Sequence, residues 1–125
     1  MRRGLTAQPD PGGSIFLYDT RSLRGEAEGW LPEDPGRSAS VRARLFRGPR
    51  GRLGIVPDPT APWVRGRLIE VTPAQMPVLD FVLGGVGAGL VRRPVDVVVS
   101  LRSTRASAWV IEDARAWRPV KQERT

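Results

Sequence analysis

The sequence contains no cysteine and no histidine. These two absences exclude disulfide bonds, thiolate nucleophiles, imidazole bases and the usual ligand sets of zinc and haem. Any catalysis therefore has to rest on carboxylates, hydroxyl groups, arginine, tyrosine or backbone amides. We expect no metal and no cofactor.

Long apolar runs are missing as well. No stretch reaches the roughly 18 apolar residues that a membrane-spanning helix needs, and Arg2 and Arg3 are not followed by the apolar segment of a signal peptide. We therefore expect no membrane partner and a cytoplasmic location.

Lysine is nearly absent, since Lys121 is the only one, so the formal net charge of +7 comes almost wholly from arginine. Such a charge fits nucleic acid, an anionic small molecule or an acidic partner. Arginine, glycine, proline and alanine are abundant together, which a GC-rich coding bias also explains, and we favour that explanation. Five arginines gather around one expected hairpin and could contact phosphates: Arg42, Arg44, Arg47, Arg50 and Arg52. Phe46 is the one aromatic residue among them that could stack on a base, so a nucleic-acid or polyanion-binding module is a minority alternative.

The 125 residues are enough for one domain with a single core. Proline and glycine predict a flexible leader over 1–13, and polar residues predict a frayed tail over 119–125, which leaves a single domain at 14–118. Period-two patterns and runs of β-branched residues predict strands at 14–18, 41–46, 52–56, 95–101 and 106–111, with a turn at 103–105. A sixth strand is expected where Val64, Gly66 and Leu68 share one face.

One helix is expected after that sixth strand. Thr72 can cap it, Pro73 suits its first position, and Gln75 completes a Thr-x-x-Gln capping box. Gly84 and Gly85 should end it, which predicts a helix over 73–83.

Several of these motifs, in this order, resemble the gamma-glutamylcyclotransferase-like superfamily. The resemblance covers roughly residues 14–112. The first motif is Tyr18-Asp19-Thr20, followed by the loop exit Leu23-Arg24-Gly25. The second is the strand Val64-x-Gly66-x-Leu68, followed by the capped helix and Leu79-Asp80. The third is a basic residue that enters a valine-rich strand, followed by Ala108-Trp109-Val110. The resemblance implies an α+β fold, a small mixed curved sheet or barrel of about six strands with one or two short helices.

The resemblance also implies a site. In that family, amides of the loop after the first strand bind the carboxylate of a gamma-glutamyl group, and an acidic residue three positions after the Asp of the Leu-Asp pair is the general acid/base. The implied substrate-binding residues here are Tyr18, Asp19, Thr20, Arg21, Ser22, Leu23, Leu83 and Arg92. Glu70 and Asp80 are further candidates at the pocket, of which Asp80 is expected to be structural. The implied partner is an anionic or gamma-glutamyl-type small molecule.

Leu83 stands at the position of the family's acid and carries no proton. The first hypothesis is therefore a degenerate site that binds a small molecule without cyclising ordinary gamma-glutamyl amines. A second hypothesis makes Asp19 the acid/base of a divergent cyclotransferase or lyase of specialised biosynthesis, with a pKa raised by desolvation beside Leu83. In this hypothesis Arg21 or a loop amide holds the substrate anion. Whether the protein is an enzyme stays open at this point.

Overall fold

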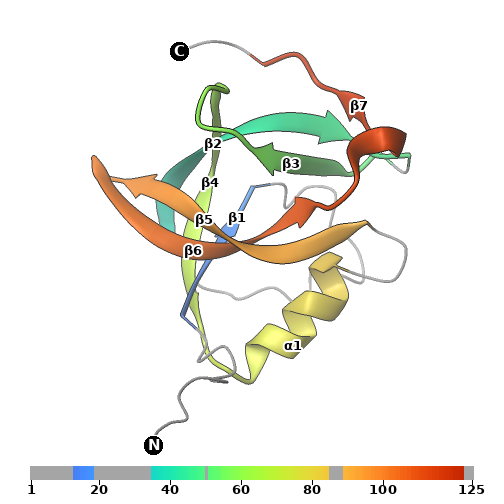
Figure 1. Ribbon diagram of the computed structural model, residues 1–125. Coiled ribbons are helices and arrows are strands. Elements are labelled where there is room, and N and C mark those ends of the chain that lie inside the picture. Colours follow the sequence, from blue (N-terminus) through green and yellow to red (C-terminus); the bar gives the residue numbers. More distant parts are fainter. Residues whose placement is uncertain (1–12, 19–34, 50, 85–88, 123–125) are drawn as a thin grey trace, which may run out of the picture.

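The computed structural model describes residues 13–18, 35–49, 51–84 and 89–122 (Figure 1). They form seven strands: β1 (Gly13–Leu17), β2 (Arg37–Arg47), β3 (Leu53–Pro57), β4 (Trp63–Val71), β5 (Leu90–Val99), β6 (Arg102–Ile111) and β7 (Arg118–Pro119). The helical segments are α1 (Gln75–Leu79), a π-helical turn that continues it (Asp80–Gly84) and a 3-10 turn (Ala114–Ala116). None of the described helices has the length and apolar character needed to cross a membrane.

Five strands close into a barrel in the order β2, β4, β1, β6 and β5. The pair of Ser40 and Val98 joins β5 back to β2 and closes the ring. The barrel is mixed, because β1 and β6 run parallel at Ile15 and Ser107 whereas the other pairs are antiparallel. β3 and β7 are additional strands that pair with the C-terminal half of β2. The expected mixed, curved α+β barrel with a short helix is confirmed.

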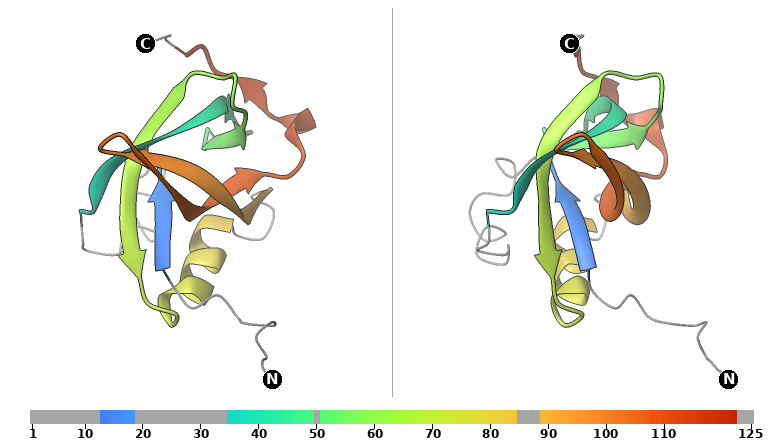
Figure 2. Two further views of the ribbon diagram at one scale, coloured as in Figure 1. Left: turned by 60° about the vertical axis from the view of Figure 1, so that its left-hand side comes forward. Right: turned by 90° about the vertical axis from the view of Figure 1, so that its left-hand side faces the viewer.

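The hydrophobic core has two parts, and β1 lies between them. Phe16 packs inside the barrel with the small and β-branched residues of β2, β5 and β6. Ile15 and Leu17 point the other way and pack with Met76, Leu79 and other residues on the helix side. Figure 2 shows β1 in blue between β4 and the helix. The run from Ile15 to Leu17 is continuously apolar because both faces of this strand are buried.

The helix differs from the sequence prediction at both ends. It begins at Gln75, because Pro73 and Ala74 form a turn in which the Gln75 N–H donates to the carbonyl of Thr72 (3.0 Å). The Gln75 side chain accepts the Thr72 N–H (2.7 Å), which is one half of the expected capping box; no side-chain cap is made at Ala74, the residue that precedes the helix. Beyond Leu79 the chain widens into the π-helical turn, which the sequence did not indicate.

The turn expected at 103–105 is wrong, because these residues belong to β6. The hairpin reverses at Ser100 and Leu101 instead, and Val99 pairs with Arg102. Both turn residues have positive φ (50° and 68°), the conformation of a two-residue type I′ turn. The sequence concealed this turn because neither residue is the glycine, asparagine or aspartate that such turns favour.

The tail expected to fray from residue 119 is instead bound to β2 as far as Gln122. Pro119 pairs with Phe46, and the Val120 N–H donates to the carbonyl of Leu45 (2.8 Å). The Gln122 amide accepts the Leu45 N–H (2.9 Å) and donates to the carbonyl of Ala43 (3.0 Å). Residues 123–125 lie outside the described residues, as do residues 1–12 of the expected leader, whereas Gly13 already belongs to β1.

Candidate functional site

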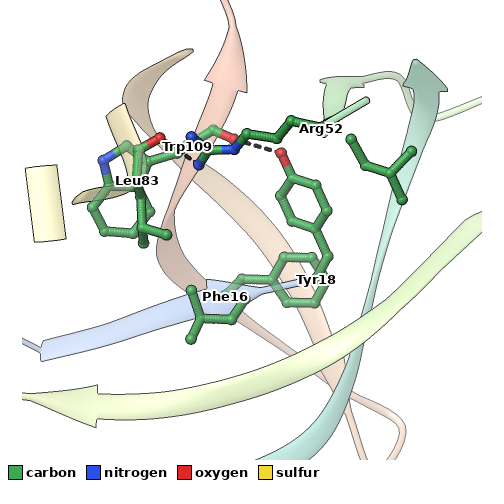
Figure 3. A pocket seen from close by; sticks show the side chains of 7 residues that line it. Phe16, Tyr18, Arg52, Leu83 and Trp109 are labelled. Atoms are coloured by element: carbon green, nitrogen blue, oxygen red, sulfur yellow. Dashed lines mark hydrogen bonds between the residues drawn. The ribbon is translucent and has the colours of Figure 1, made fainter. Parts of the chain in front are cut away.

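A small cavity lies where the C-terminal end of β1 meets the start of β3 and the end of the π-helical turn. It measures about 20 Å³, and its lining is mostly apolar: Phe16, Leu17, Tyr18, Arg52, Leu53, Leu83 and Trp109 (Figure 3). A volume of this size holds about one water molecule. We call it the Tyr18–Leu83 cavity, after two of the residues that the sequence resemblance assigns to the site.

Tyr18 is fixed in the wall of this cavity. Its hydroxyl donates a hydrogen bond to the carbonyl of Trp109 (2.8 Å), and its ring stacks on Phe16 with centroids 5.9 Å apart. A phenol held at both its ring and its hydroxyl forms a fixed part of the cavity wall.

Leu83 closes the cavity from the helix side and is 3% exposed. The guanidinium of Arg52 donates to its carbonyl oxygen. Arg52 thus places a positive charge at the carbonyl end of the π-helical turn, where the backbone dipoles favour a cation. Sequence reasoning grouped Arg52 with the basic hairpin and missed it as a cavity residue, because its contact joins segments 31 residues apart.

No aspartate or glutamate is found among the described residues that line the Tyr18–Leu83 cavity. Asp80 lies on the far side of Trp109, where one carboxylate oxygen accepts the indole N–H (3.1 Å) and the other pairs with Arg92 (3.2 Å). These contacts give Asp80 the structural role that the sequence predicts: it connects the π-helical turn to β6 and β5. The described acids also form no cluster of three that could hold a metal ion.

The structure separates several of the expected site residues from this cavity. Arg92 lines a neighbouring hollow with Asp80, Phe81 and Trp109, so a role for Arg92 in ligand binding stays a prediction. Glu70 is exposed on β4, where it accepts a hydrogen bond from the Ser14 hydroxyl. Asp19, Thr20, Arg21, Ser22 and Leu23 lie outside the described residues.

The arginines of the basic hairpin make separate local contacts. Arg42 stacks on the Trp63 ring at 4.2 Å and donates to the carbonyl of Ala61 (2.8 Å). Arg44 lies over Phe46 at 5.1 Å. Arg47 donates to the carbonyl of Gly51 (2.8 Å), and Arg50 lies outside the described residues. These contacts give the described arginines roles within the fold, and the nucleic-acid alternative stays a prediction.

No known family model matches this sequence, and no curated protein matches it significantly. Three solved structures share its architecture. YkqA from Bacillus subtilis superimposes with a TM-score of 0.63 at 14% identity, over 87% of this chain and 38% of that one. Uncharacterized protein loc79017 from Homo sapiens gives 0.63 at 15% identity, over 88% and 72% of the two chains. At3g28950.1 from Arabidopsis thaliana gives 0.59 at 19% identity, over 89% and 71%.

These similarities establish the fold, which is gamma-glutamylcyclotransferase-like in all four chains. This chain spans little more than a third of YkqA. At identities below 20%, the comparisons show that the strands and the helix are arranged alike, and they show no activity.

Proposed function

We propose that this protein is a small-molecule-binding domain of the gamma-glutamylcyclotransferase-like fold whose catalytic site is degenerate. The observation that carries the proposal is the position of Leu83. Its side chain faces the cavity that Tyr18 lines, it is almost fully buried, and no described residue of the lining brings a carboxylate in its place.

The chemistry explains why this matters. When a gamma-glutamyl amine cyclises, its α-amino nitrogen attacks the gamma carbonyl, a proton leaves that nitrogen, and the departing amine takes up a proton. A positioned acid/base that carries the proton between the two nitrogens contributes about 10² to 10⁴ in rate. Leucine cannot do this, and the described cavity offers a phenol whose hydroxyl already donates to Trp109 and an arginine, which does not act as a base.

Replacing Leu83 by glutamate tests the proposal. If the carboxylate is the missing part, Leu83→Glu should release 5-oxoproline from gamma-glutamyl amines at a rate at least about a hundredfold above that of the unmodified protein.

The matched control is Leu83→Gln, which has the same shape and cannot take up a proton. The two variants should bind ligands alike and differ in turnover, measured as 5-oxoproline formed per minute by chromatography. Circular dichroism of both should show that the barrel is intact. Equal turnover in the two variants, with the fold intact, would contradict the proposal.

A second candidate assigns the acid/base to Asp19, the residue that follows Tyr18 in the chain. Its support is that Tyr18, the residue that precedes Asp19 in the sequence, lies in the cavity wall. This candidate requires that the unmodified protein turn over a gamma-glutamyl or related substrate and that Asp19→Asn abolish the reaction. Activity that survives Asp19→Asn would eliminate it.

A further inference from the structure

A larger groove adjoins the Tyr18–Leu83 cavity. It measures about 390 Å³ and is formed by strand ends and by the C-terminal segment: Tyr18, Leu45, Leu53, Trp63, Val64, Arg65, Lys121 and Gln122. Tyr18 and Leu53 line both hollows, so the two lie next to each other. We call it the tail groove. Its volume lies within the range of about 300–1,000 Å³ typical of small-molecule sites, which the Tyr18–Leu83 cavity alone does not reach.

The tail segment gives this groove a fixed wall. Val120 is held by its bond to Leu45, and Gln122 is held by its two bonds to Leu45 and Ala43. Lys121 lies between these two anchored residues, so its backbone position is set from both sides. The wall is therefore part of the folded structure.

The charges of the groove have one sign. Arg65 and Lys121 bring two cations, and none of the described lining residues is acidic. Neither side chain makes a hydrogen bond or an ion pair with any other residue that the structure describes, in contrast to Arg42, Arg47 and Arg52. Two uncompensated cations beside an apolar surface match a molecule with an anionic end and an apolar body.

Trp63 contributes its indole ring to that apolar surface. Arg42 stacks on its ring at 4.2 Å, which orients the indole and adds positive potential nearby. Leu45 and Leu53 complete the apolar wall on the side of Tyr18.

We propose that the tail groove binds a small organic anion. Its carboxylate or phosphate lies between Arg65 and Lys121, its apolar part packs on Trp63, and its other end reaches Tyr18. This inference rests on the proposed small-molecule-binding function and extends it, because it identifies the class of ligand and two residues that select it.

Titrations of the isotope-labelled protein with phenyl phosphate and with benzoate test this proposal by two-dimensional NMR. Both anions should shift the indole N–H of Trp63 and the backbone amides of Lys121 and Gln122 saturably. Benzyl alcohol, which has the same ring and no charge, should leave these signals nearly unchanged. The anion that binds more tightly identifies the preferred head group, and preference for either one supports the proposal.

The double variant Arg65→Gln/Lys121→Gln should weaken anion binding about tenfold, as expected for the loss of two charge-assisted contacts. The matched control is Arg67→Gln/Arg118→Gln, which removes the same charge from exposed positions outside the groove and should change the Kd less than about twofold. Equal weakening in both double variants would show general electrostatic attraction and overturn the proposal. Saturable shifts confined to other parts of the barrel would overturn it as well.

These results are separable from those of the catalytic proposal. If Leu83→Glu gains turnover while Arg65→Gln/Lys121→Gln leaves anion binding unchanged, the groove assignment fails and the degenerate catalytic site stands. If the groove binds anions as expected while Leu83→Glu and Leu83→Gln have equal turnover, the groove assignment stands and the proposal of a degenerate catalytic site fails.

Discussion

Gly66 of β4 shows how closely the chain packs at single residues. A Cβ atom at this position would lie 2.2 Å from the carbonyl oxygen of Leu17 and 2.8 Å from the ring of Phe16. The first of these atoms belongs to the backbone of the paired strand β1 and cannot turn aside. Gly66 is therefore the residue that lets β1 and β4 approach each other, and it leaves room for the ring of Phe16.

Gly66→Ala should lower the free energy of unfolding by about 1–3 kcal/mol or more, the usual cost of overpacking a core. Chemical denaturation measures the loss. The matched control is Gly84→Ala, since a Cβ at Gly84 would meet its nearest neighbour at an ordinary 3.4 Å. Similar losses in the two variants would show that the contact with Leu17 is not the cause.

Some residues of the candidate site could be predicted from the sequence, and others could not. Tyr18 and Leu83 could be brought together in advance, because the family resemblance assigns both to one pocket and the structure places both in one lining. The role of Arg52 and the tail groove could not be predicted from the sequence. No local pattern shows which hairpin arginine donates to the carbonyl of Leu83, or that Gln122 binds β2. Such contacts depend on tertiary packing, which residue spacing does not encode.

Among the elements, the β5–β6 hairpin carries a strained turn. Ser100 and Leu101 both have positive φ, and the Leu101 side chain is 98% exposed, so no packing compensates for its backbone conformation. A left-handed conformation costs an L-residue roughly 1–2 kcal/mol.

Leu101→Gly should therefore stabilise the protein by about 0.5–1 kcal/mol, once the entropy that glycine loses on folding is subtracted. Leu101→Ala is the control, because it removes the same exposed side chain and keeps the same strain. The melting temperature should rise for glycine and change little for alanine. An equal rise in both would mean that the exposed side chain, and not the backbone, is the source of the strain.

The elements themselves were largely predictable, since alternation and β-branched runs identified six strands and proline, glycine and the Gln75 cap identified the helix. The π-helical turn after Leu79 was not predictable from the sequence. It places Asp80 where its carboxylate meets both Trp109 and Arg92, and these partners come from β6 and β5. The local sequence contains the carboxylate but not the partners that make this turn favourable.

At the scale of the whole molecule, the barrel depends on pairings between distant segments. β1 pairs with β6 at Ile15 and Ser107, and a single bridge between Ser40 and Val98 closes the ring. The sequence predicts a curved mixed sheet through its resemblance to a known superfamily, and the solved structures of that fold agree. The order of the strands in the barrel and the pairing of β7 with β2 required the structure, because strand patterns do not specify partners.

The central proposal is that this protein binds a small molecule but lacks the proton carrier that cyclisation needs. The most direct test is 5-oxoproline formation by the purified, unmodified protein from a panel of gamma-glutamyl amines. We predict no turnover above that of a heat-denatured sample, because Leu83 cannot move a proton between the two nitrogens. Sustained turnover by the native protein, at rates typical of enzymes and lost on unfolding, would contradict the account.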